Sequence, residues 1–65
     1  MTAYVEIELD GKLYKGEYHV DDGDVVTVYG HSGSEFTPLG GSKPESMAKI
    51  LLRRLAQRGE IDPEP

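Results

Sequence analysis

The 65-residue sequence contains no cysteine, no tryptophan and no long apolar run. Without cysteine, the chain can form no disulfide, no thiolate zinc site and no cysteine nucleophile. No apolar stretch approaches the length of a transmembrane helix and no segment resembles a signal peptide, so we expect a cytoplasmic protein without membrane contact. A chain this short typically buries only about 60% of its unfolded surface. Because small domains without cross-links are commonly stabilised by oligomerisation, we expect a homodimer or a complex with a protein partner.

Basic residues are scarce overall and are concentrated in one segment. Seven Lys and Arg stand against twelve Asp and Glu, which gives a net charge of −5. Residues 1–41 carry eight acids and two lysines, whereas residues 42–59 carry five bases and one acid. Nucleic-acid-binding domains are usually basic, so only the second segment supports a partner of that kind.

The segment Ser42–Gly59 is the only one with helical periodicity. Ser42 and Glu45 have the spacing of a capping box, in which each side chain bonds the other residue's backbone N–H. Pro44 suits the first turn, and Gly59 suits the left-handed position that ends a helix. The apolar stripe that such a helix would bury consists of Met47, Ala48, Leu51, Leu52 and Leu55. We therefore predict an amphipathic helix of about four turns.

The first twenty residues have the alternation of two paired strands. Thr2–Leu9 and Lys12–Val20 flank Asp10-Gly11, a dipeptide that favours a two-residue hairpin turn. Gly16, inside the second strand, either lets the helix approach closely or marks a bend. The turn predicts the pairs Leu9 with Lys12, Ile7 with Tyr14, Glu6 with Lys15, Val5 with Gly16 and Ala3 with Tyr18.

The second turn is expected at Asp21-Asp22-Gly23. A three-residue loop with Gly23 left-handed places Tyr18 opposite Val26 and keeps the inner face of the sheet apolar. A two-residue turn at Asp22-Gly23 would instead send Val26 outward. We therefore favour the three-residue loop.

The remaining strands complete an α+β fold. Asp24–Gly30 is rich in β-branched residues and is the third predicted strand. The sequence leaves open whether Glu35–Thr37 adds a fourth strand, which Pro38 would confine to an edge. We predict an antiparallel meander of three or four strands with one C-terminal helix packed on one face. Residues 1–59 form this single domain, and residues 60–65, acidic with two prolines, form a frayed tail.

Several patterns have the residue types of a ligand site but not its spacing. The acidic run Asp21–Asp24 lacks the twelve-residue ligand pattern of a calcium loop and suits a tight turn. His19 and His31 would need further ligands, such as Glu17, to bind zinc, so we interpret them as surface residues. The serines and glycines match neither a nucleophile elbow nor a phosphate-binding loop. We therefore expect no enzymatic activity, no metal and no cofactor.

The helix offers two features that could bind an anion or an acidic partner. Gly40–Lys43 precedes the free N–H groups of the helix N-terminus, although a capping box would occupy some of them. A basic face comprises Lys43, Lys49, Arg53, Arg54 and Arg58 and could contact phosphates or an acidic surface. The simpler interpretation is a solvated face that balances the acidic sheet. The part of the helix expected to be free for a partner is Ile50, Arg54 and Arg58.

The outer face of the predicted sheet carries apolar residues among matched charges. These apolar residues are Tyr4, Leu13, Val25, Tyr29 and Phe36. A solvated sheet face usually alternates more cleanly, and such a mixture is typical of a contact surface. The alternative is that Tyr and Val favour strands even when they are exposed.

The runs IELDGKLYKGEY (7–18), Val25–Tyr29 and PLGGSKPESMAKILLRRL (38–55) resemble very small bacterial proteins in which three strands precede a helix. The resemblance covers most of the chain and depends on a hairpin, a Gly-Gly turn and a capped helix. It implies the same architecture and a bacterial origin, and it implies no catalytic residue or cofactor.

These patterns together predict a non-enzymatic protein-interaction or self-associating domain. We expect it to act through the outer sheet face or an exposed strand edge. The alternative function is nucleic-acid or acidic-ligand binding through the basic helix face, at Lys49, Arg53, Arg54 and Arg58.

Overall fold

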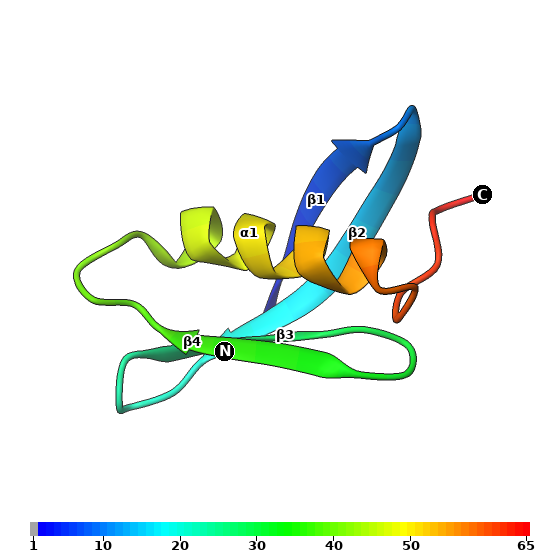
Figure 1. The fold of residues 1–65 in the computed structure, drawn as a ribbon. Helices are drawn as coiled ribbons and strands as arrows, with labels where there is room; N and C mark the ends of the chain where they lie inside the picture. The colour runs from blue at the N-terminus through cyan, green and yellow to red at the C-terminus, as the bar shows by residue number, and fades with distance from the viewer. Residues whose placement is uncertain (1) are drawn as a thin grey trace.

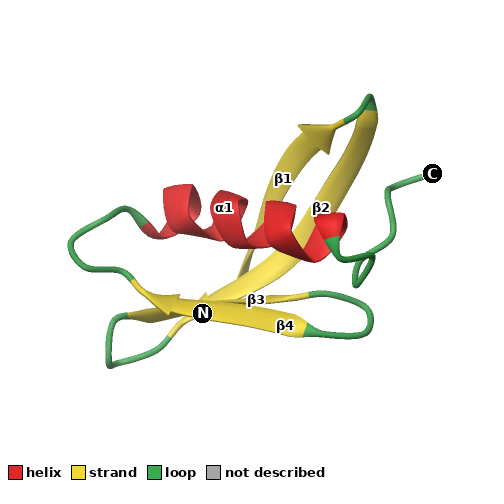
Figure 2. Ribbon diagram, in the orientation of Figure 1, coloured by secondary structure: helices red, strands yellow, loops and turns green. Residues whose placement is uncertain are grey.

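The computed structural model describes residues 2–65 and contains one antiparallel sheet and one helix (Figure 1). The elements are β1 (Thr2–Leu9), β2 (Lys12–Val20), β3 (Val25–Tyr29), β4 (Ser34–Pro38) and α1 (Pro44–Gln57). The strands lie in the order β1-β2-β3-β4, so each pairs with its sequence neighbours. The helix crosses one face of the sheet, and no helix or strand of residues 2–65 covers the other face (Figure 2). The predicted α+β meander is confirmed, with four strands.

The β1–β2 hairpin has the register that the sequence predicts. Asp10 and Gly11 have positive φ values of 54° and 76°, as a primed two-residue turn requires. Leu9 faces Lys12, and every other predicted pair is present. The hairpin is longer than the two remaining strands, and its tip extends past α1 (Figure 1).

The turn between β2 and β3 lies one residue later than predicted. The Asp24 N–H donates to the Asp21 carbonyl oxygen at 3.1 Å, and the left-handed residue is Asp24 (φ 58°) instead of Gly23. The Asp21 side chain explains this position. Its Oδ1 accepts hydrogen bonds from the backbone N–H groups of Gly23 at 2.9 Å and Val25 at 3.2 Å, which is the way Asp commonly stabilises a turn.

The later turn changes the pairing of β2 with β3. Tyr18 faces Val28, not Val26, so the predicted register is wrong by two residues. Because the side-chain period of a strand is two, this even shift preserves which residues face inward. Val26 and Val28 are both fully buried, as the three-residue loop requires.

The fourth strand exists and forms the edge of the sheet beside β3. Phe36 faces Thr27 across the strand pair, and Pro38, the last residue of β4, faces Val25. An edge position suits Pro38, because proline has no N–H to donate to a further strand. Alternation along β4 directs Phe36 outward and Glu35 toward the helix side.

The helix begins in a different way from the prediction. Its N-cap is Lys43, with φ −73° and ψ 137°, and Pro44 is the first helical residue. No side chain caps this end, so the predicted capping box of Ser42 and Glu45 is wrong. The cause is Pro44, which disfavours helical backbone at the residue before it. A Ser42 cap would require Lys43 to be helical.

The helix ends at Gln57 with Arg58 as its C-cap, and Gly59 takes the left-handed position beyond it, as predicted. Gly59 has φ 74°, and its N–H donates to the Ala56 carbonyl oxygen at 3.2 Å. The Glu60 N–H donates to the Leu55 carbonyl oxygen at 2.9 Å. This pair of bonds is the Schellman arrangement, which satisfies carbonyl groups that the helix itself leaves unpaired.

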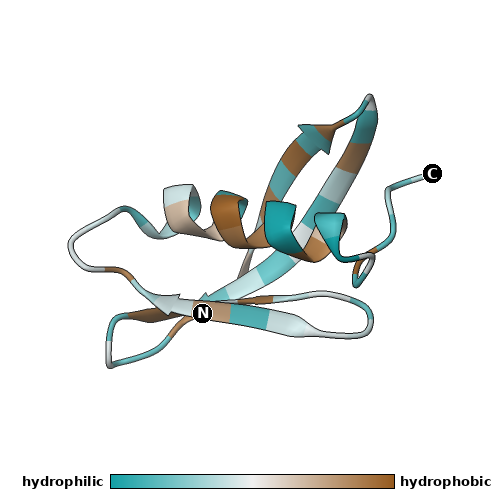
Figure 3. Cartoon of the chain, viewed as in Figure 1, coloured by the Kyte–Doolittle hydropathy of each residue, from teal (hydrophilic) through white to brown (hydrophobic). Residues whose placement is uncertain are grey.

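The core lies between α1 and the inner face of the sheet. Figure 3 shows the apolar residues of α1 concentrated in its middle turns. The core consists of Val5, Ile7, Val26, Val28, Ala48, Leu51, Leu52, Leu55 and Ile61, with Met47 partly buried against it. A Cβ on Gly16 would lie 2.8 Å from Leu52 Cδ1 and 3.3 Å from Val28 Cγ1. Close approach of the helix is therefore the role of Gly16.

The segment after the helix is held against the sheet. The Glu60 carbonyl oxygen accepts a hydrogen bond of 2.8 Å from the His31 N–H in the β3–β4 turn. Ile61 is buried in the core, and the Glu64 N–H donates to the Leu13 carbonyl oxygen at 2.6 Å. These contacts lie within residues 60–65, which the sequence analysis assigned to a frayed tail, and only Ile61 of that segment is buried. The burial of Ile61 provides the apolar contact that holds the segment.

Candidate functional site: the outer face of the sheet

The outer face of the sheet has a charged half and an uncharged half. On β1 and β2, the outward positions include Glu6, Glu8, Lys15 and Glu17. On β3 and β4, the outward positions are Val25, Thr27, Tyr29, Ser34, Phe36 and Pro38, none of which is charged. This uncharged half is notable because 29% of the residues in the chain are charged.

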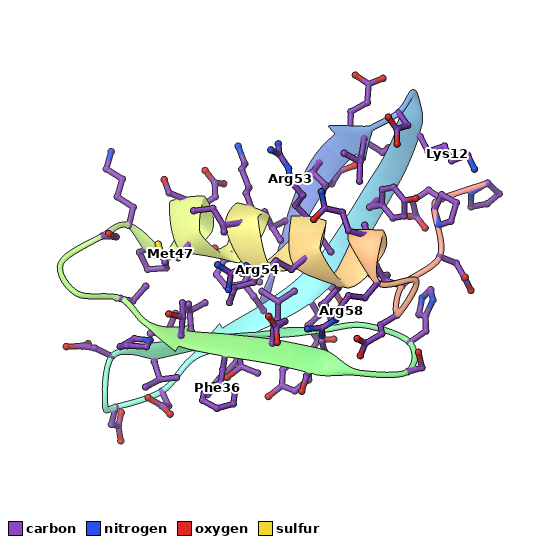
Figure 4. All side chains as sticks on the ribbon, viewed as in Figure 1. Lys12, Phe36, Met47, Arg53, Arg54 and Arg58 are labelled. Carbon is purple, nitrogen blue, oxygen red and sulfur yellow. The ribbon has the colours of Figure 1, made fainter. Side chains whose placement is uncertain are left out.

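Two aromatic side chains dominate the uncharged half. Phe36 is 71% exposed and Tyr29 is 46% exposed. Since Phe36 faces Thr27, its diagonal neighbours on β3 are Val25 and Tyr29, at about 7–8 Å. We call Val25, Tyr29 and Phe36 the β3–β4 patch. Figure 4 shows Phe36 projecting from the side of the sheet opposite α1.

Tyr4 lies at the border of the charged half. It shares a row across the sheet with Tyr29, and Glu17 lies between them. Tyr4 is 61% exposed, and the Lys15 Nζ lies 5.0 Å from its ring centroid. This distance allows a cation–π interaction, so the Tyr4 ring already has a partner within the fold.

Leu13 lies apart from the other predicted contact residues. It is 44% exposed and faces Glu8 near the tip of the β1–β2 hairpin. The structure thus brings Val25, Tyr29 and Phe36 together, places Tyr4 beside them and separates Leu13 from them.

The basic helix face is partly neutralised by acidic residues of the fold. Arg58 contacts Glu60 and lies 3.2 Å from Glu35, and Arg54 lies 3.8 Å from Glu35. Hydrogen bonding to Glu60, and further to Glu35, holds the pKa of Arg58 above its ordinary value. Figure 4 shows Arg54 and Arg58 on the side of α1 that faces β4, and Arg53 on the opposite side. Arg54 and Arg58, which the sequence analysis expected to be free for a partner, therefore each have a carboxylate of the fold beside them.

Glu35 and Ile61 are the residues whose roles the sequence interpretation missed. Glu35 faces inward because its neighbour Phe36 faces outward, and strand alternation would have placed it near the helix. Ile61 follows the helix-ending Gly59 by two residues. A Schellman end is frequently accompanied by an apolar contact from the residue directly after the glycine. That residue is Glu60 here, and Ile61 makes the apolar contact instead.

The remaining bases of the helix line its outer side. Lys49 and Arg53 form a shallow depression together with Ile50. Ile50 is 48% exposed, so the expectation that it faces away from the core is confirmed. Lys43 precedes the first turn as the N-cap.

The two histidines lie in different parts of the fold. His19 faces Thr27 across the sheet. His31 lies in the β3–β4 turn, where its Nδ1 accepts a hydrogen bond of 3.1 Å from the Asp62 N–H. Among residues 2–65, no three His, Cys, Asp or Glu side chains are grouped as metal ligands.

The fold and this surface define the class of the protein. It is a small α+β domain in which a helix covers one face of a four-stranded antiparallel sheet and leaves an aromatic face open. No helix of the part that the structure describes is long and apolar enough to span a membrane. Comparison with protein-family models, curated proteins and solved structures gives no match to this chain.

Proposed function

We propose that this protein is a non-enzymatic interaction domain that forms a homodimer through the outer face of β3 and β4. The observation that carries the proposal is the exposure of Phe36, at 71%, within an uncharged surface. A large apolar side chain exposed to this extent gains free energy when a partner removes it from water, at about 25 cal/mol per Å². Contiguous apolar surface with a charged border is typical of protein–protein contacts.

The charge distribution favours a second copy as the partner. Each chain carries a net charge of −5, so two copies repel each other over most of their surfaces. The uncharged half formed by β3 and β4 is the part of the sheet where two copies can meet without opposing like charges. A symmetric contact also pairs Phe36 with an identical apolar surface, which satisfies the self-complementarity of a two-fold interface.

The small core supports association as a source of stability. A domain of this size has only a small margin of stability, and burial of further apolar surface in a dimer adds to it. Specific interfaces typically bury about 800 Å² on each partner. The outer positions of β3 and β4 supply the apolar centre of such an area.

The test is size-exclusion chromatography with light scattering at micromolar concentration. We expect the mass of two chains for the natural sequence and the mass of one chain for Tyr29→Ser/Phe36→Ser. Both side chains lie outside the core, so circular dichroism should show that the variant remains folded. The melting temperature of the natural protein should also rise with protein concentration, because dimerisation stabilises the folded state by mass action.

Ile50→Ser is the matched control. Ile50 is about as exposed as Tyr29, at 48% against 46%, but it lies on α1, away from the outer sheet face. We expect this variant to remain a dimer. A natural protein that elutes as a monomer, or a dimer that survives the loss of Tyr29 and Phe36, would refute the proposal.

A further inference from the structure

The strand at the other edge of the sheet, β1, has an open side. β1 pairs with β2 through eight consecutive residues, without a bulge. Within residues 2–65, no strand pairs with its other side. A strand in this position presents unpaired N–H and C=O groups in a regular row, which is the arrangement that binds an added strand.

The two edges of the sheet differ in how well they resist strand addition. β4 is five residues long and ends in Pro38, which has no N–H to offer. β1 is eight residues long and contains no proline, glycine or lysine. Proteins usually protect edge strands with charged side chains, proline, bulges or short length. The only charges on β1 are Glu6 and Glu8, which repel an acidic strand but not a basic one.

The side chains of β1 indicate which strand would fit. Its inward residues Val5 and Ile7 are buried in the core, and its outward residues Glu6 and Glu8 are exposed. Glu6 faces Lys15 on β2, whereas Glu8 faces the uncharged Leu13. An added strand with Lys or Arg beside the carboxylates and small apolar residues on the other face would complement both sides of β1.

We propose that the β1 edge binds an extended basic peptide segment by strand addition. The net charge of −5 attracts such a segment over a longer range and raises the rate of encounter. Pairing of two β1 strands is less favourable, because it gathers the Glu6 and Glu8 carboxylates of both copies on one face. This site goes beyond the proposed homodimer, since the β1 edge and the β3–β4 patch lie at opposite sides of the sheet.

The test is a titration of the isotopically labelled protein with a synthetic seven-residue peptide of alternating lysine and valine, followed by nuclear magnetic resonance. We expect the largest chemical-shift changes at the backbone amides of residues 2–9, together with slower hydrogen exchange there. Two peptides serve as controls. One replaces the central valine with proline, which keeps the charge but interrupts the hydrogen-bond row, and the other replaces every lysine with glutamate.

We expect the proline peptide to bind about tenfold more weakly and the glutamate peptide not to bind. Glu6→Gln/Glu8→Gln should also weaken the lysine peptide about tenfold. Asp22→Asn/Asp62→Asn, which makes the same charge change in the β2–β3 turn and beside His31 of the β3–β4 turn, should bind the peptide as the natural protein does.

Three results would overturn the inference. They are the absence of binding at low salt, equal binding of the proline peptide, and shifts centred on the Asp21–Asp24 turn instead of β1. The variant Tyr29→Ser/Phe36→Ser separates this site from the dimer. We expect it to bind the peptide normally as a monomer, so failure of either proposal can be seen without the other.

Discussion

Gly16 is the residue that sets the distance between α1 and the sheet. A side chain at this position would meet Leu52 and Val28 at distances shorter than ordinary van der Waals contact. Both neighbours are fully buried, so neither can move without disturbing the core. The glycine therefore allows the helix to pack directly on β2.

Gly16→Ala should lower the free energy of unfolding by about 1–3 kcal/mol, because overpacking a filled core forces its neighbours to shift. Gly23→Ala is the matched control. A Cβ there would meet only the Asp21 carboxylate, at 3.4 Å, and Gly23 is not among the glycines with positive φ. We expect the control to change stability by less than about 0.5 kcal/mol. Urea unfolding followed by circular dichroism measures both. Equal stability of the two variants would contradict the role of Gly16.

The pairing of β1 with β2 could be predicted residue by residue from the sequence, whereas the ion pairs of Glu35 could not. The register of β1 with β2 follows from Asp10-Gly11 and from the match of apolar and charged pairs, and all these signals agree. The ion pairs of Glu35 could not be specified in the same way. They depend on whether β4 forms, and the sequence left that question open because Glu35–Thr37 is short.

At the level of elements, the two ends of α1 differ in how they are satisfied. The C-terminal end has the Schellman bonds of Gly59 and Glu60, whereas the N-terminal end has no side-chain cap. Lys43 occupies the N-cap, a position where Ser, Thr, Asp and Asn are preferred. A preferred residue at the N-cap would therefore make the N-terminal end of the helix more stable.

Lys43→Ser should stabilise the protein by about 0.5–2 kcal/mol, because a serine at the N-cap can accept a hydrogen bond from the first turn. Ser42→Ala should change stability by less than about 0.5 kcal/mol, because Ser42 precedes the N-cap and caps nothing. Thermal unfolding measures both variants. A capping box at Ser42 and Glu45 would reverse this result, since Ser42→Ala would then cost about 1 kcal/mol.

The β2–β3 turn shows why an element can be predicted while its exact position is not. Loops of three residues starting at Asp21 or at Asp22 both leave Val26 and Val28 facing inward, because the registers differ by two. The hydrophobic pattern therefore cannot distinguish them. The choice depends on the hydrogen bonds of the Asp21 carboxylate and on the tolerance of Asp24 for a left-handed backbone.

At the level of the whole molecule, basic and acidic residues are concentrated on different elements. The basic helix lies over an acidic sheet, and Glu35 and Glu60 connect the two by pairing with Arg54 and Arg58. The sequence predicted the separation of charge along the chain. It did not predict this pairing, which depends on residues 35 and 60 meeting the same turn of α1.

Nucleic-acid binding through the basic helix face is the alternative function, and we expect the protein not to show it. Of the five bases of this face, Arg54 and Arg58 lie beside carboxylates, and the whole chain carries a net charge of −5. Titration of fluorescently labelled single- and double-stranded DNA at low salt should give no saturable binding. Phosphate contacts make affinity fall steeply with salt. A salt-sensitive affinity that is lost in Lys49→Glu/Arg53→Glu, but kept in the sheet control Lys12→Glu/Lys15→Glu, would assign nucleic-acid binding to the helix.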